Sequence, residues 1–193
     1  VLGFCLGSPV EGAWRIGYSA ISGAFAPLWI AADAGLFKKH GLDVELVYTR
    51  AGPVSLAALL AGETRVVAIG SDAVVAAYLA GNREVAIIAA VTNTIVTSMM
   101  AHSSIGSPID LKGKTVAISR FGGLIDFSAR YILRQHGLEP GRDVTLIQAG
   151  GVPEVIALMQ RGAAQAGVMS PPTTLRAQQL GYHELVNLAD LNF

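Results

Sequence analysis

The stretch "GLDVELVYTRAGPVSLAALLAG", residues 41–62, decides the fold because the chain repeats it one hundred positions later. Residues 141–162 read "GRDVTLIQAGGVPEVIALMQRG", and seven of the 22 positions are identical. Similarity at a fixed internal shift indicates that one structural unit occurs twice. The identical positions are Gly41, Asp43, Val44, Leu46, Pro53, Ala57, Gly62 and their counterparts. The sequence therefore predicts two similar lobes.

The same shift aligns the flanking segments, since "RIGYSAISG" (15–23) falls on "TVAISRFGG" (115–123). In the first copy, short apolar runs alternate with segments in which apolar residues recur at helical spacing. The predicted strands are 15–19, 43–48 and 66–69, and the predicted helices are 26–39, 53–61 and 72–80. Strands that alternate with helices favour a parallel sheet, so the predicted fold class is α/β with two doubly wound lobes.

The boundary between the lobes is predicted from composition. Two more apolar segments, 85–91 and 96–101, are expected to complete the first sheet, and the Ser-, Gly- and Pro-rich stretch that follows them resembles a linker. The predicted organisation is a leader remnant or disordered N-terminus at 1–14, a first lobe at 15–103, a hinge at 104–109 and a second lobe at 110–193.

Composition excludes several functional classes. The chain is 52% hydrophobic and 15% charged, with a net charge of zero and no cluster of basic residues. Nucleic acid is therefore not an expected partner, because its phosphates require a basic surface. The single cysteine, Cys5, cannot form an internal disulfide, and no Cys/His cluster has zinc-ligand spacing. We expect no metal and no cofactor. Lipidation of Cys5 stays open, although Phe4 fits such a cleavage site poorly.

The candidate ligand site lies in the loops that lead from strands into helices. In open parallel sheets, ligands bind beyond the carboxyl ends of the strands, where helix N-termini offer unpaired N–H groups. For one such loop alone, a helix cap or a turn is the favoured interpretation, whereas for four equivalent loops on two facing lobes a ligand cleft is equally well supported. The predicted ligand-binding residues are Ser19, Ser22, Gly23, Phe25, Gly70, Ser71, Asp72, Arg120, Phe121, Gly122, Gly123 and Ser170.

Specific roles follow from residue chemistry. Arg120 is the one basic residue of these loops and is the candidate partner of an acidic group on the ligand, with a surface arginine as the alternative. Asp72 is expected to cap its helix, and it would favour an amine if it faced the cleft. Phe25 and Phe121 are candidate walls of the pocket. No cleft loop supplies His, Glu or Cys, and no catalytic motif occurs, which disfavours an enzyme.

Four longer motifs carry a family resemblance: "FAPLWIAADAGLFKKHGLDVELV", "AALLAGETRVVAIGSD", "SPIDLKGKTVAIS" and "ALMQRGAAQAGVMSPP". They resemble the periplasmic substrate-binding proteins of ABC importers in the nitrate/sulfonate/taurine group and the related thiamine-precursor-binding proteins. The resemblance implies a type II binding-protein fold with a ligand cleft between its lobes. It also implies a small anionic or zwitterionic solute, a membrane permease as partner, a monomer, and a periplasmic or extracytoplasmic location.

By position, the family's cleft loops match Ser19, Ser22, Ser71, Ser119, Gly122 and Ser170. The resembled proteins are longer, and after the second lobe their chain returns to finish the first. We therefore expect this chain to be truncated at its C-terminus, with an incomplete first lobe. Two alternatives on a similar fold stay open: an enzyme of the lyase or pyrimidine-synthase type, and the effector-sensing domain of a transcription regulator.

Overall fold

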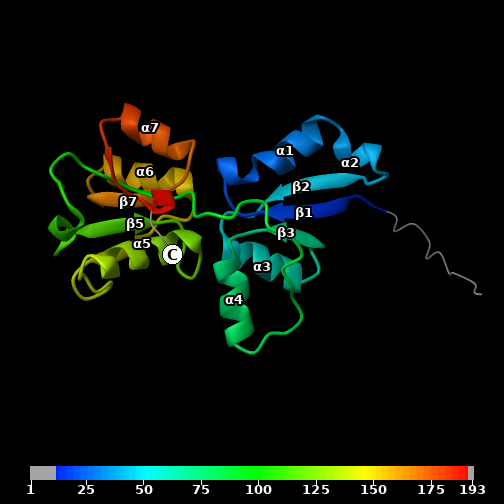
Figure 1. Ribbon diagram of the computed structural model, residues 1–193, viewed down its shortest axis with the longest axis horizontal. Coiled ribbons are helices and arrows are strands. Elements are labelled where there is room, and N and C mark those ends of the chain that lie inside the picture. Colours follow the sequence, from blue (N-terminus) through cyan, green and yellow to red (C-terminus); the bar gives the residue numbers. More distant parts are fainter. Residues whose placement is uncertain (1–11, 191–193) are drawn as a thin grey trace, which may run out of the picture.

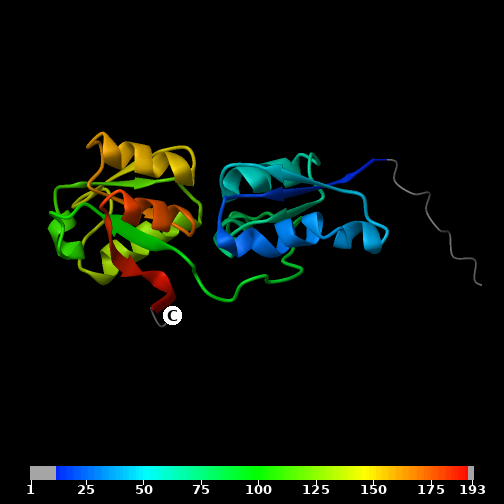
Figure 2. The same ribbon diagram turned by 90° about the horizontal axis from the view of Figure 1, so that it is seen from above.

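A computed structural model describes residues 12–190 and shows two α/β bodies joined by an extended segment (Figures 1 and 2). The predicted leader remnant and Cys5 lie outside the described residues. The first lobe, residues 14–79, has a parallel three-stranded sheet in the order β2-β1-β3 with helices on both faces. Its elements are β1 (Trp14–Tyr18), η1 (Gly23–Phe25), α1 (Ala26–Asp33), α2 (Leu36–Lys39), β2 (Val44–Tyr48), α3 (Gly52–Leu60), β3 (Val66–Ala68) and α4 (Ser71–Leu79).

The second lobe, residues 98–190, has a five-stranded sheet in the order β6-β5-β7-β4-β8. Strands β6, β5 and β7 run parallel, while β4 runs antiparallel to both β7 and β8. Its elements are β4 (Ser98–Ala101), η2 (Pro108–Leu111), β5 (Thr115–Ile118), α5 (Leu124–Gln135), β6 (Thr145–Gln148), α6 (Val152–Gln160), β7 (Ala166–Met169), α7 (Thr173–Gln179), β8 (His183–Asn187) and η3 (Leu188–Asp190).

The register of the strands repeats at the shift that the sequence shows. The order β2-β1-β3 in the first lobe corresponds to β6-β5-β7 in the second, and the paired residues are also one hundred positions apart. The equivalent pairs are Ile16–Leu46 with Val116–Leu146, and Ile16–Val66 with Val116–Ala166. The predicted duplication of an α/β unit is therefore present in the backbone pairing.

Two predicted elements of the first lobe differ in the structure. The helix expected at 26–39 is divided into α1 and α2, because Gly35 between them has a left-handed conformation with φ 67°. The segment 85–91, expected to be a strand, pairs with no described strand and runs as extended chain. An apolar run becomes a strand only where a neighbouring strand satisfies its backbone groups.

The predicted position at which the chain crosses from the first lobe to the second is also wrong. The segment expected at 96–101 to complete the first sheet forms β4, which belongs to the second sheet. The predicted hinge at 104–109 therefore lies between two strands of one sheet, and Ile105 within it is 3% exposed. The chain crosses from one lobe to the other between α4 and β4, along the segment 80–97 that Figure 2 shows running below the two bodies.

Burial is distributed unequally between the lobes. The continuous hydrophobic core is formed by residues of the second lobe, with Met99, Ile132 and Leu133 fully buried at its centre. The first lobe and the segment after it carry many of the exposed large apolar side chains, including Leu79 at 79% and Ile88 at 81% exposure. Side-chain packing therefore stabilises the second lobe far more than the first.

We predict that Leu133→Ala destabilises the protein by about 2–5 kcal/mol, because it removes fully buried methyl groups from α5 and leaves a cavity. The matched control is Leu79→Ala in α4, which we expect to change the free energy of unfolding by no more than about 0.5 kcal/mol. Urea denaturation measures both variants. Equal losses for the two would contradict the location of the core in the second lobe.

Candidate functional site

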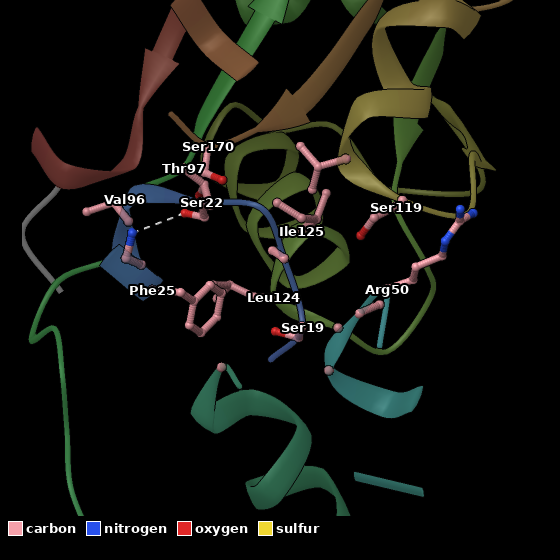
Figure 3. Close-up of a pocket in the computed structure, with 18 residues that line it drawn as sticks. Ser19, Ser22, Phe25, Arg50, Val96, Thr97, Ser119, Leu124, Ile125 and Ser170 are labelled. Atoms are coloured by element: carbon pink, nitrogen blue, oxygen red, sulfur yellow. Dashed lines mark hydrogen bonds between the residues drawn. The ribbon is translucent and has the colours of Figure 1, made fainter. Parts of the chain in front are cut away.

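A cavity lies between the lobes, at the carboxyl ends of the parallel strands of both sheets (Figure 3). It measures about 70 Å³, on a scale where one water molecule needs about 10–15 Å³. A solute of a few non-hydrogen atoms is of suitable size. The lining residues are Ser19, Ala20, Ser22, Ala24, Phe25, Arg50, Ala51, Gly52, Gly70, Val96, Thr97, Ser119, Gly123, Leu124, Ile125, Gly151, Val152 and Ser170.

Half of the predicted site residues line this cavity. These are Ser19, Ser22, Phe25, Gly70, Gly123 and Ser170, and Ser119 of the family's matching loops joins them. The other predicted residues lie beside the lining without being part of it: Gly23, Ser71, Asp72, Arg120, Phe121 and Gly122. The four predicted loops therefore meet between the lobes, but each loop presents only some of its polar residues to the cavity.

Three serine hydroxyls at the cavity have no hydrogen-bond partner among the described residues: those of Ser19, Ser119 and Ser170. Ser119 and Ser170 are only 5% and 3% exposed. None of these three hydroxyl oxygens is fully buried, so each is open to a partner that enters the cavity. Ser19 follows β1 of the first lobe, whereas Ser119 and Ser170 follow β5 and β7 of the second. A bound solute could take hydrogen bonds from both lobes at once.

Other lining hydroxyls serve the local structure. The Ser22 hydroxyl caps η1 by accepting a hydrogen bond from the Ala24 N–H at 3.3 Å, drawn as a dashed line in Figure 3. The Thr97 hydroxyl lies 3.0 Å from the Ser128 hydroxyl of α5. Next to Ser22, the Gly23 N–H donates to the Pro171 carbonyl oxygen across the lobes at 2.9 Å. These contacts fix the loops around the cavity.

The charged residue that lines the cavity is Arg50, which sequence reasoning missed. Arg120, the predicted partner of an acidic group, is outside the lining, and its Nε is buried without a partner. Phe121, a predicted wall, is 47% exposed and lies 5.9 Å below the Arg130 guanidinium. The repeated pattern of strands and helices could have identified Arg50 as a residue of the cleft. Because all strands of a parallel sheet end at one edge, the loop after β2 reaches the cleft just as the loops after β1 and β3 do.

Arg50 forms an ion pair between the lobes. Its Nη1 lies 3.3 Å from Oε1 of Glu154, in the first turn of α6. Both groups act on the nearby Tyr48 hydroxyl. Burial raises the pKa of Tyr48, the Glu154 carboxylate raises it further, and the Arg50 guanidinium lowers it.

Asp72 lies where α4 of the first lobe meets α5 of the second, and it does not cap its helix as predicted. The N-cap residue of α4 is Gly70, and Asp72 occupies the second helical position. Both Asp72 carboxylate oxygens are buried, and no described side chain donates a hydrogen bond to them. Burial raises the pKa of Asp72 to about 6, although the backbone N–H groups of Asp72 and Ala73 act to lower it. The Asp126 carboxylate at the start of α5 makes a smaller contribution to the rise.

Neither a metal site nor a membrane-spanning helix is supported by residues 12–190. No group of three or more His, Cys, Asp or Glu residues in this part of the chain could hold a metal ion. Nor does any helix there combine the length and the apolar character that crossing a bilayer requires.

Comparison with known proteins supports the fold and a family. Residues 22–191 match the family described as NMT1/THI5 like. YtlA of Bacillus subtilis (strain 168), named for an inferred binding role, is 32% identical over 128 residues, which are 64% of this chain and 38% of YtlA. A Brucella abortus (strain 2308) relative named in the same way is 29% identical over 81% of this chain and 48% of its own length. The chain thus spans less than half of the curated relatives it matches.

Solved structures share the arrangement of the two lobes. The alkanesulfonate-binding protein SsuA from Xanthomonas axonopodis pv. citri, bound to MOPS, aligns with a TM-score of 0.75 at 22% identity over 96% of this chain and 64% of that one. The periplasmic aliphatic sulphonate binding protein SsuA from Escherichia coli aligns with a TM-score of 0.68 at 23% identity over 94% and 58%. The predicted fold class, a periplasmic-binding-protein fold of two α/β lobes with a cleft between them, is confirmed.

The buried Asp72 carboxylate predicts a pH-dependent stability. Its folded-state pKa lies above that of an exposed aspartate, so its contribution is favourable below about pH 4 and is lost as the pH rises through about 6. We expect Asp72→Asn to raise the melting temperature at about pH 7.5, and the gain to disappear by about pH 4. Thermal melts across this range measure the effect, with Asp33→Asn on exposed α1 as the control. A gain that does not change with pH would contradict this assignment.

Proposed function

Because the chain belongs to the NMT1/THI5-like family, we propose that it is the solute-binding component of an ABC transport system. In this role the protein captures a small solute between its lobes and makes or breaks no covalent bond. A membrane permease is the partner that would receive the solute. The proposed location is periplasmic or otherwise extracytoplasmic, and the proposed state is a monomer.

One observation carries the proposal: serine hydroxyls without hydrogen-bond partners among the described residues line a cavity from both lobes. A ligand with acceptor oxygens would gain about 0.5–1.5 kcal/mol from each hydrogen bond that such a hydroxyl donates. Ser19 on one side and Ser119 and Ser170 on the other are suitable donors. A solute that accepts from both sides stabilises the closed arrangement over an open one, as lobe closure around a ligand requires.

The remaining lining suits an anionic or zwitterionic solute with an apolar part. Helix α5 begins at Leu124, and its first N–H groups, on Leu124 and Ile125, have no intrahelical acceptor. Such N–H groups and the helix dipole favour a negative charge. Phe25 and Ile125 offer apolar contacts. An alkanesulfonate or taurine fits this combination, and nitrate fits its anionic part alone. Among the described residues, the lining contains no His, Cys, Asp or Glu for acid–base chemistry.

A thermal-shift screen tests the proposed function. We predict that the protein is stabilised by at least one of nitrate, bicarbonate, taurine, short alkanesulfonates or small carboxylates. A ligand that binds only the folded state adds about 2.7 kcal/mol at a hundredfold excess over its Kd. Ser119→Ala and Ser170→Ala should each weaken the binding of that solute by about 3- to 10-fold.

Ser71→Ala is the matched control, because Ser71 is exposed at the start of α4 and is not part of the cavity lining. It should leave the affinity unchanged. Stabilisation that survives both cavity variants would place the solute elsewhere on the protein and would contradict the proposal.

A further inference from the structure

Arg50 has a backbone conformation that arginine adopts at a cost. Its φ is 52° and that of the following Ala51 is 132°, and these are the non-glycine residues with positive φ among those described. Side chains with a Cβ rarely adopt positive φ, and such positions cost about 1–3 kcal/mol each. The loop between β2 and α3 is therefore strained where Arg50 reaches the cavity.

The second lobe shows how the same loop is built without strain. One hundred positions later, between β6 and α6, the equivalent residues are Gly150 and Gly151, and Gly150 has φ 104°. Glycine adopts this conformation freely because it has no Cβ. The first lobe thus keeps an arginine where its own repeat uses glycine. Local backbone geometry does not explain that choice, so the reason lies in what the guanidinium contacts.

The contact that Arg50 makes is weak. The Nη1–Oε1 distance to Glu154 is 3.3 Å, and the two side chains are 61% and 41% exposed. Exposed ion pairs contribute about 0–1 kcal/mol. Arginine binds carboxylates most strongly through two parallel hydrogen bonds, but here one nitrogen is used, and Nε and Nη2 have no acceptor within residues 12–190. The pair leaves Nε and Nη2 unused, and an anion bound there would share the single positive charge of Arg50 with the Glu154 carboxylate.

We propose that Arg50 selects solutes that carry an oxyanion, and that Glu154 competes with the solute for the Arg50 guanidinium. This inference rests on the proposed function of the cavity. Arg50 is the one charged residue among the described residues that line it, and Figure 3 shows it on the same side of the pocket as Ser119. The oxyanion of a sulfonate or a carboxylate would accept two parallel hydrogen bonds from Nε and Nη2.

The competition makes two variants act in opposite directions. Arg50→Gln removes the cation and should weaken the binding of an oxyanion by about 10- to 100-fold. Glu154→Gln removes the competitor and should strengthen it by about 3- to 10-fold. If the ion pair served only to hold the lobes together, both variants would weaken binding alike.

Arg50→Gly separates charge recognition from loop strain. The glycine relieves the backbone while removing the guanidinium, so the melting temperature without solute should rise, and oxyanion affinity should fall as in Arg50→Gln. A merely structural arginine would not give this combination. Arg161→Gln, an exposed arginine at the end of α6, is the control for the loss of one positive charge.

The experiment is calorimetric titration of the purified protein and these variants with four probes: butane-1-sulfonate, its uncharged sulfonamide, pentanoate and its uncharged amide. We expect wild type to bind one or both anions more tightly than the matching amide, and Arg50→Gln to abolish that preference. The two anions show whether the oxyanion is a sulfonate or a carboxylate.

Each other outcome overturns a stated claim. Anion binding that is equal in wild type, Arg50→Gln and Glu154→Gln would overturn the role of Arg50 and leave the solute-binding function standing. Tighter binding of the amides than of the anions would do the same. If wild type binds none of these probes and also shows no response in the thermal-shift screen, the proposed function itself fails, and the selection by Arg50 fails with it.

Discussion

The parallel pairing of three strands in each lobe is the constraint on which the rest of the structure depends. Because β1, β2 and β3 run in one direction, the loops that follow them emerge at one edge of the sheet, and β5, β6 and β7 do the same in the second lobe. The lobes face each other with these edges. Serine, glycine and one arginine at the strand ends thereby reach a single cavity although they lie far apart in the sequence.

The two copies of this unit differ in the strands that extend the shared three-stranded sheet. In the second lobe, β4 lies antiparallel beside β7 and carries β8 on its other side, and the residues of this sheet form a continuous core. In the first lobe the described sheet ends at β3, and apolar side chains such as Tyr78 and Leu79 are more than half exposed. The cavity therefore has one firmly packed wall and one wall whose stability depends less on a core. Movement of the first lobe relative to the second is the physical expectation for closure on a solute.

The sequence predicted the duplicated α/β unit because its signals are local: periodic apolar residues, glycines at turns and a fixed internal shift. It failed where an element depends on a distant partner. No periodicity reveals that β4 inserts antiparallel into the second sheet, or that residues 85–91 lack a neighbouring strand. At the site, Ser19, Ser119 and Ser170 follow from the loop pattern, whereas Arg50 became evident only when the loop after β2 was seen to reach the same edge. Asp72 suits a helix cap by residue type, yet the helix begins two residues too early for that role, at Ser71.

The central claim is that one solute is held by both lobes between Ser19 and the pair Ser119 and Ser170. A crystal structure of the protein with the most stabilising solute of the screen tests it most directly. We expect density for the solute in the interlobe cavity, with oxygen atoms within hydrogen-bond distance of hydroxyls from both lobes and of the Arg50 guanidinium. Density on the outer surface of one lobe, with the three hydroxyls still without partners, would contradict it.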